Sequence, residues 1–411
     1  MTARNGVSGR CVSRRGVMKG MGAAGLAAGA LGTFSPSRLL AGEGPVTILG
    51  IIPQTGPYAA DGEQIMRGQQ MAVESFGGEI LGRPINYIIR DTGNDSGIAT
   101  RRVAEAIESE NVVGIVGPWA DDVAQAVADV ARREKVIHYW SGGPVECHRY
   151  WFQWAPPYYT GVKGSMDYAM QKNPDGKRWY MLTSDYAFGW TMEELEKRIG
   201  ADHDIEWVGE SRHVLGEREF SRYMGEIMAA SPDVLVLNNF GLDTAQAIRE
   251  AVSFGLGQST QILVPWGSGI EDYLRQDPSI TEGIIIGSAF YFTAEPAREF
   301  SDAFIDLHGA PPGYPAGSGF AALEILLKGI ERAGSSDPAE VVQALEGWEF
   351  DSVVGPTRID ADTHQTIRPF FVTEGKAPGD MEDEFDVARV VSTSSEMPPA
   401  EELGCEDIGE L

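Results

Sequence analysis

The sequence predicts an α/β protein built from two lobes, each a parallel sheet wrapped by helices. Continuous apolar runs alternate with helical patterns, which is typical of strands buried on both faces. This alternation stops in the Gly- and Pro-rich stretch 140–159 and then restarts. The length of 411 residues exceeds what one core normally holds, and 43% apolar content with nine Trp indicates a folded protein.

The elements of the first lobe begin after Pro45. We expect strands at 46–52, 85–89, 112–116 and 136–139, with a helix after each of the first three. Such alternation places parallel strands beside one another with helices on both faces. The irregular stretch that follows is interpreted as the first crossing between lobes, ending near Pro156.

The second lobe repeats the pattern. Strands are expected at 178–182, 205–208, 233–237, 262–265 and 283–287, with helices after the first three. Gly255 is expected to close the helix after 233–237 as its C-cap.

The C-terminal part contains helical patterns near 296–308, 314–333 and 338–346, the last opened by Asp337 as N-cap and Pro338 as its first residue. Short strands follow in "GPTRID" and "IRPFFVTEG". Helices without matching parallel strands must cover an existing sheet, so we expect the helices to return to lobe 1 and the strands to cross to lobe 2. Three crossings make a three-stranded hinge. The predicted domains are 42–156 with 290–348 as lobe 1, 157–289 with 349–380 as lobe 2, and 381–411 as a C-terminal tail.

Residues 1–41 resemble a twin-arginine export signal. Arg14, Arg15 and Lys19 precede a weakly apolar, Gly/Ala-rich stretch, and Ala41 is a candidate for the residue before cleavage. The alternative is a short membrane helix. No apolar run after residue 41 is long enough for a membrane helix.

The mature chain is strongly acidic. Residues 1–41 hold six basic and no acidic residues, so their removal leaves 27 basic and 60 acidic residues, a net charge of −33. This charge argues against nucleic acid and anionic lipid as partners. Two cysteines remain, Cys147 and Cys405, and an even number in an exported protein suggests a disulfide, with two free thiols as the alternative. No Cys/His spacing suggests a metal site.

Known catalytic motifs are absent from the sequence. It has no G-x-x-x-x-G-K-[ST], no H-E-x-x-H and no G-x-S-x-G. A carboxylate pair for glycoside chemistry stays open because its members need not be close in sequence. We therefore expect neither catalysis nor a cofactor, with an exported hydrolase as the remaining enzyme alternative.

Aromatic residues instead follow the predicted strands. In open α/β sheets, ligands bind outside the carboxyl ends of strands, and rings with a few polar groups line small-molecule clefts. One such turn is "TSDYAFGW" at 183–190. We expect Asp185 to cap the next helix or hold the turn, and Phe188, before the permissive Gly189, to face a ligand.

Long stretches of the chain resemble the periplasmic solute-binding proteins of branched-chain amino-acid-type ABC transporters. They include "ILGIIPQTGPYAADGEQIMRGQQMAVE", "NVVGIVGPWADDVAQAVADVA", "DYAFG", "NNFGLDTAQAIREAVSFGL" and "RPFFVTEGK", in order over nearly all of 45–376. The resemblance implies two Rossmann-like lobes that close on a ligand, a fold known as the type I periplasmic binding protein.

The family's ligand contacts can be carried over by motif. The resemblance implies that Asp121 stands where a small hydroxyl residue is usual, Pro144 where threonine is usual, and Trp266 where amino-acid binders have a glutamate for the ligand's amino group. Phe188 and Phe240 occupy the corresponding lobe-two turns. The predicted ligand-binding residues are Tyr58, Trp119, Asp121, Trp140, Ser141, Gly142, Gly143, Tyr186, Phe188, Phe240, Trp266 and Tyr291.

These departures make a standard branched-chain amino acid a poor candidate ligand. A buried ammonium needs a compensating charge, which Asp121 could supply while Trp faces add cation–π attraction. Otherwise the ligand is an aromatic compound, an amide or urea. The resemblance also implies a monomer in the periplasm that meets ABC permease subunits, and a Cys147–Cys405 pair that ties the tail to lobe 1. A periplasmic receptor that feeds a signalling partner is the alternative function.

Overall fold

The computed structural model describes residues 44–411 except 141, 143–146, 396–397, 399–404 and 406–407. Its first sheet has six strands in the order β2-β3-β1-β4-β5-β6. Their bounds are Val46–Ile52 for β1, Glu79–Ile80 for β2, Arg83–Asp91 for β3, Val112–Val116 for β4, Ile137–Trp140 for β5 and Trp151–Gln153 for β6. All pairs are parallel except β2 with β3. We call this sheet and the helices packed on it lobe 1.

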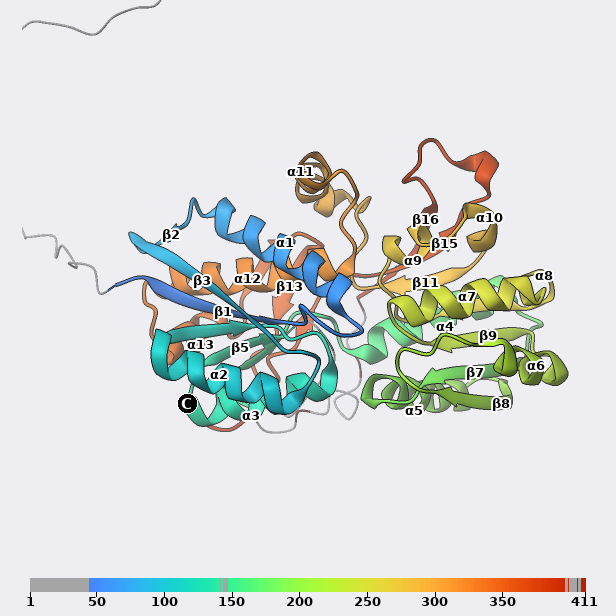
Figure 1. Ribbon diagram of the computed structural model, residues 1–411, viewed down its shortest axis with the longest axis horizontal. Coiled ribbons are helices and arrows are strands. Elements are labelled where there is room, and N and C mark those ends of the chain that lie inside the picture. The colour runs from blue at the N-terminus through green and yellow to red at the C-terminus, as the bar shows by residue number, and fades with distance from the viewer. Residues whose placement is uncertain (1–43, 141, 143–146, 396–397, 399–404, 406–407) are drawn as a thin grey trace, which may run out of the picture. The chain divides into compact units, whose positions relative to one another are not determined.

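Helices cover both faces of the first sheet (Figure 1). Helix α1 (Ala59–Ser75) packs along α12 (Tyr314–Ala333), which also contacts β4 and β5. Helices α2 (Ser96–Glu110) and α3 (Asp121–Glu134) pack together on the other face. Asp337 caps α13 (Pro338–Leu345) as predicted, since its side chain accepts from the amides of Ala339 and Glu340. Helix α11 (Arg298–His308) follows the short 3-10 turn Glu295–Ala297.

The second sheet has seven strands in the order β16-β15-β11-β10-β9-β7-β8, and we call it and its helices lobe 2. The strands are Arg178–Ser184 (β7), Glu206–His213 (β8), Val234–Asn238 (β9), Gln261–Val264 (β10), Ile285–Ser288 (β11), Phe370–Gly375 (β15) and Ala388–Ser394 (β16). Strands β15 and β16 are antiparallel to their neighbours, so the sheet is mainly parallel. The helices are Tyr158–Lys172 (α4), Ala187–Ala201 (α5), Ser221–Ala230 (α6), Leu242–Ser253 (α7), Leu256–Ser259 (α8), Ile270–Leu274 (α9) and Pro278–Thr281 (α10). The predicted fold class, an α/β protein with two lobes built on mainly parallel sheets, is confirmed.

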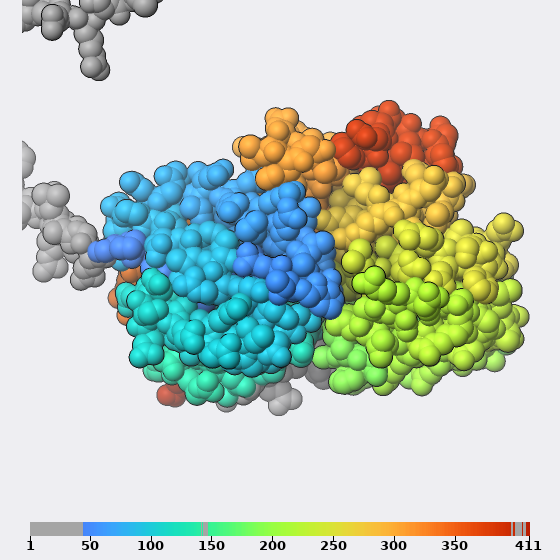
Figure 2. All heavy atoms as spheres, viewed as in Figure 1, coloured from blue at the N-terminus to red at the C-terminus, as the bar shows by residue number. Residues whose placement is uncertain are grey.

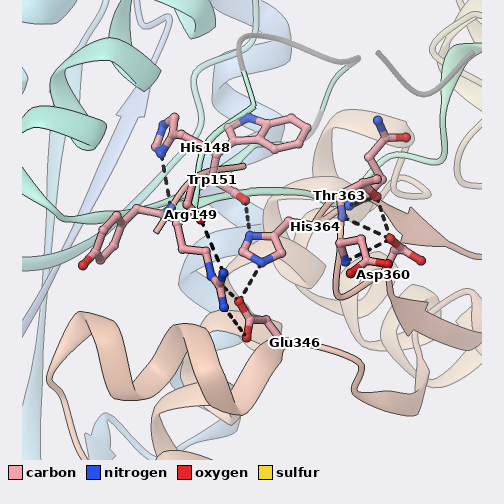
Figure 3. A network of polar contacts seen from close by, with 11 residues as sticks. His148, Arg149, Trp151, Glu346, Asp360, Thr363 and His364 are labelled. Carbon is pink, nitrogen blue, oxygen red and sulfur yellow. Dashed lines mark hydrogen bonds and ion pairs between the residues drawn. The ribbon is translucent and has the colours of Figure 1, made fainter. Parts of the chain in front are cut away.

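A third, three-stranded sheet was not expected as a separate unit. It contains β12 (Glu349–Ser352), β13 (Gly355–Ile359) and β14 (Thr366–Ile367), all antiparallel. A polar network ties it to lobe 1 (Figure 3). The imidazole of His364 lies 3.0 Å from both the Trp151 carbonyl and the Glu346 carboxylate, which also pairs with Arg149 at 2.7 Å.

The domain boundaries stay a prediction, but strand pairing locates the chain crossings. The first crossing lies between β6 and α4, and the second follows β11, close to the predicted positions 156 and 290. The third lies between β14 and β15, around Arg368, because β12–β14 do not join the seven-stranded sheet. The tail contributes β16 to lobe 2, and Cys405 then packs in lobe 1 with Ala124, Ala128, Trp140 and Trp151. The 3-10 turn Pro378–Asp380 lies between β15 and β16.

One smaller expectation differs from the structure, and another is met in the second of its two forms. The C-cap of α7 is Phe254, and Gly255 follows it in the left-handed conformation, with φ of 84°. Asp185 does not cap α5, whose N-cap is Tyr186 without a side-chain bond. Asp185 instead accepts a hydrogen bond from the Trp190 indole at 2.8 Å, so it holds the turn, and Trp190 is 48% exposed.

Candidate functional site

A cavity lies between the two lobes, where turns from both of them converge. Eleven described residues line it, and the empty space between them, including the part open to solvent, is about 350 Å³. Eight of the eleven are aromatic: Tyr58, Trp119, Tyr158, Tyr186, Phe188, Phe240, Trp266 and Tyr314. The others are Ala120, Asp121 and Gly142.

Strand ends position most of these rings. Trp119 and Asp121 follow β4, where Gly117 adopts φ of 102° and a Cβ there would lie 2.3 Å from the Ile51 carbonyl oxygen. Phe188 follows β7, and a Cβ at Gly189 would lie 2.0 Å from the Ser184 carbonyl oxygen. At both turns a side chain at the glycine position would therefore push the ring-bearing segment away from its strand.

The rings form a continuous series of edge-to-face and tilted contacts across the two lobes. Tyr158 packs edge-on against Trp266 and Phe188, with ring centroids 4.8 and 5.7 Å apart. Phe188 contacts Phe240 at 6.0 Å, which contacts Trp119 of lobe 1 at 5.5 Å. Such contacts keep the rings rigid and buried. The surfaces of the two lobes meet in Figure 2 along a narrow boundary between the blue and yellow-green atoms.

Hydrogen bonds cross from lobe to lobe at the cavity, among them one from the Tyr314 amide to the Ser268 carbonyl at 3.1 Å. The Tyr58 hydroxyl donates to the Tyr186 hydroxyl at 2.8 Å. The Tyr158 hydroxyl donates to the Asp121 carboxylate, whose oxygens are 3.1 and 3.2 Å away. Burial raises the pKa of the half-buried Asp121 to about 7, and the hydrogen bond from Tyr158 acts in the opposite direction. The structure thus represents a closed arrangement of the lobes.

A second contact between the lobes, which we call the Arg275 cluster, contains Arg275 with Asp61, Glu271 and Asp272. The guanidinium lies 3.5 Å from Asp61 of α1, 3.8 Å from Glu271 and 3.7 Å from Asp272. Burial raises the pKa of Glu271 to about 8 and of Asp272 to about 7, although Arg275 acts in the opposite direction. Burial also raises the pKa of Asp61, which is opposed by Arg275 and by a hydrogen bond from Trp119.

The structure brings eight of the twelve predicted ligand-binding residues together at the cavity: Tyr58, Trp119, Asp121, Gly142, Tyr186, Phe188, Phe240 and Trp266. Trp140 instead lies in the cluster around Cys405, and the buried Tyr291 donates to the Ala388 carbonyl at 3.3 Å. Ser141 and Gly143 lie outside the described residues, as do Pro144 and residues 1–41. Ligand contact by any of them stays a prediction.

Sequence reasoning missed Tyr158 and Tyr314. Both begin a helix, α4 and α12, so they do not follow a strand. Each comes just after a proline pair, in "PPYY" and "PPGYP", which was a usable signal for an aromatic residue at a fixed helix start.

The described residues contain neither a metal-ligand cluster nor a membrane-crossing helix. No group of three or more His, Cys, Asp or Glu side chains is placed to hold a metal ion there. None of the helices in the described ranges combines the length and apolar character that a membrane crossing requires.

With this geometry in place, comparisons with known proteins define the class. A periplasmic binding protein family model matches residues 45–380, and the chain belongs to this family. It is 25% identical to a Leu/Ile/Val-binding protein homologue of Brucella melitensis over 79% of this chain and 90% of that protein. An amino acid ABC transporter substrate-binding protein from Pseudomonas fluorescens is 32% identical with a TM-score of 0.84, covering 88% of this chain and 98% of that chain.

A third comparison shares the fold alone. It is a solute-binding protein of an ABC transporter from R. palustris, solved in complex with benzoate, 22% identical with a TM-score of 0.75 over 88% of this chain and 100% of that chain. Proteins of this family bind substrates for transport and are not enzymes.

Proposed function

We propose that the protein captures a small solute in the aromatic cavity and delivers it, in the closed form, to the permease of an ABC importer. The observation that supports this most is the cavity itself, which both lobes line and across which hydrogen bonds join them. A ligand held by both lobes stabilises the closed form by its higher affinity for that form. The protein performs no catalysis in this proposal.

The ligand differs from a standard branched-chain amino acid. Trp266 lines the cavity with its side chain 2% exposed, at the position where the family resemblance places a glutamate. Rings dominate the lining, which suits an aromatic compound, an amide or urea, or a ligand with a positive charge. The related proteins named above bind amino acids or benzoate, so both kinds of solute belong in a test.

Tryptophan fluorescence tests the proposal directly, because Trp119 and Trp266 line the cavity. The mature chain is titrated with a broad solute library, and hits are checked by the rise in melting temperature that ligand binding produces. We expect a saturable fluorescence change and a higher melting temperature with at least one solute. If no solute in the library produces either signal, the proposal fails.

The working location is proposed to be the periplasm, after export through a twin-arginine signal and cleavage near Ala41, and the protein is proposed to act as a monomer. The Cys147–Cys405 disulfide belongs to the same proposal. The Cα atoms of the two cysteines are 5.6 Å apart, a separation that suits a disulfide. Intact mass of the exported protein, before and after reduction, tests both the cleavage and the bond.

A further inference from the structure

The charge inventory of the cavity is one-sided. Among its eleven described lining residues, the one charged side chain is Asp121, and none is Lys, Arg or His. The adjoining stretch 141–146, "SGGPVE", adds no basic residue to this part of the chain. A ligand carboxylate would therefore meet a carboxylate and ring faces with no cation among the lining residues, which is electrostatically unfavourable.

Asp121 has unused hydrogen-bonding capacity. Among the described residues its side-chain donor is Tyr158, whose hydroxyl carries a single proton shared between the two carboxylate oxygens. An ionised carboxylate can accept about four hydrogen bonds. Asp121 is half-buried and lines the cavity, so the remaining acceptor sites are available to a bound solute.

The rings around Asp121 favour the same kind of ligand. Ring faces are negative in their electrostatic quadrupole and attract cations, most strongly those of Trp and Tyr. Six of the eight lining rings are Trp or Tyr. Cation–π attraction and a carboxylate thus act together in one small space.

Two arginines lie near the cavity, the partly exposed Arg275 and the buried Arg368; both have partners elsewhere, although Nη1 of Arg275 and Nη2 of Arg368 have no hydrogen-bond partner among the described residues. Arg275 is surrounded by the three carboxylates of its cluster. Arg368 stacks on Trp154 at 3.7 Å and donates to the carbonyls of Trp154, Ala289 and Pro369. Neither side chain lines the cavity.

We propose that the solute captured in the aromatic cavity is a small organic cation and that Asp121 is its counter-ion. This inference rests on the proposed function and specifies its ligand class. It differs from the aromatic acid bound in the R. palustris protein, because an acid would need a cation and the described lining residues include none.

A charge series with one carbon skeleton tests the inference. Benzylammonium, benzamide and benzoate have nearly the same shape and carry charges of about +1, 0 and −1 at neutral pH. Leucine is included as the zwitterionic reference. Calorimetric titration of the mature chain at pH 8 should give benzylammonium an affinity at least about 10-fold above benzamide and benzoate.

The variant Asp121→Asn keeps the shape and an oxygen that can accept from Tyr158 but removes the charge. It should weaken benzylammonium at least about 10-fold and change benzamide less than about threefold. Asp122→Asn is the matched control, because Asp122 lies in the same first turn of α3 but is exposed. It should leave both affinities unchanged, which excludes an effect of helix charge alone.

The outcomes separate this inference from the proposed function. If benzamide or benzoate binds as tightly as benzylammonium, or if Asp121→Asn leaves benzylammonium binding intact, the ligand is not a cation, while the transport function stands. No binding of benzylammonium at all also overturns the inference. Only the failure of every solute in the broad library overturns the proposed function as well.

Discussion

The two lobes meet at the aromatic cavity and at the Arg275 cluster, and these regions compensate buried carboxylates in different ways. In the cluster, three carboxylates share a cation that belongs to the protein. In the cavity, Asp121 faces rings and a single tyrosine hydroxyl. The carboxylates of the cluster are compensated by a cation of the protein, whereas under the proposal above Asp121 receives its cation from the ligand.

The two regions also differ in what surrounds their carboxylates. A Cβ at Gly313 would lie 2.5 Å from the Glu271 carboxyl carbon, and one at Gly267 would lie 2.5 Å from an oxygen of Asp272. The amide of Ser268 also donates to Asp272 at 2.6 Å. Backbone therefore closes tightly around the carboxylates of the cluster, whereas side-chain rings dominate the lining around Asp121 in the cavity.

The largest expected effect comes from Arg275→Gln, which leaves three buried carboxylates without their cation. We expect a loss of about 3–5 kcal/mol in the free energy of unfolding at pH 8, as for other broken buried pairs. Urea unfolding followed by tryptophan fluorescence measures it. The control Arg101→Gln removes an exposed partner of Glu105, 3.9 Å away, and should cost less than about 1 kcal/mol. Equal losses in the two variants would show that the Arg275 cluster contributes no more to stability than an exposed ion pair.

Protonation of the cluster gives the second effect. Because burial raises the pKa of Glu271 to about 8, the folded protein holds a proton that the unfolded chain releases above about pH 4.5. Between about pH 4.5 and 8, the free energy of unfolding is therefore greatest at the low-pH end and falls as the pH rises. The fall is on the order of 1 kcal/mol per pH unit.

The variant Glu271→Gln isolates this contribution. It should flatten the decline of the urea midpoint between pH 5 and 8, whereas Glu105→Gln, an exposed partner of Arg101, should leave the decline unchanged. An unaltered slope in Glu271→Gln would show that other groups, such as the buried Glu196, whose pKa burial raises to about 8, dominate the pH dependence.

The packing of the aromatic cavity can be tested with a pair of glycines in helices. A Cβ at Gly161 of α4 would lie 2.6 Å from the Trp266 ring and 2.7 Å from the Phe370 ring, so Gly161→Ala should cost about 1–3 kcal/mol and weaken ligand binding. Gly225 of α6 has no atom within 4 Å of its added Cβ, and Gly225→Ala should stabilise the protein by up to about 1 kcal/mol. If both variants were equally stable, Trp266 would be less tightly held than the contacts indicate.

The regular parts of this fold could be predicted from the sequence because their apolar patterns are long and continuous. Strands β1 and β4 occupy the predicted residues, 46–52 and 112–116. Strands β6, β12 and β16 were missed for different reasons. Strand β6 has three residues in a Pro- and Trp-rich stretch, β12 has four residues of which one is buried, and β16 is a partly exposed edge strand. Short or exposed strands depend on their neighbours, which the sequence does not show.

The candidate site could be predicted only for residues that follow the carboxyl end of a strand, where ligands bind in open α/β sheets. Phe188, Phe240 and Trp266 follow strands and line the cavity together, as expected of carboxyl ends in one sheet. Tyr158 and Tyr314 reach it from helix starts, a position that depends on how the chain crosses between lobes. Trp140 is the last residue of β5 and packs with Trp151 in the cluster around Cys405, and although its ring lies beside Gly142, it is not among the lining residues.

The smallest effect sharpens the role of Asp121. Binding of a cation requires its ionised form, and burial raises the pKa of this carboxyl to about 7 in the closed protein. The affinity for benzylammonium should therefore be constant above about pH 8 and fall by up to about 10-fold per pH unit below 7, because a proton must leave first. The amine itself stays protonated over pH 5 to 8, so the change comes from the protein.

The groups around Asp121 do not produce such a dependence. Burial raises the pKa of Tyr58, Tyr186 and Tyr314, so these hydroxyls stay uncharged over this range. Tyr158 is a neutral donor, and Asp122 is exposed on the same helix. Asp121→Asn should therefore make the residual affinity independent of pH, while Glu271→Gln should keep the wild-type profile. A profile that followed Glu271 instead of Asp121 would mean that closure of the lobes, and not charge selection in the cavity, sets the affinity.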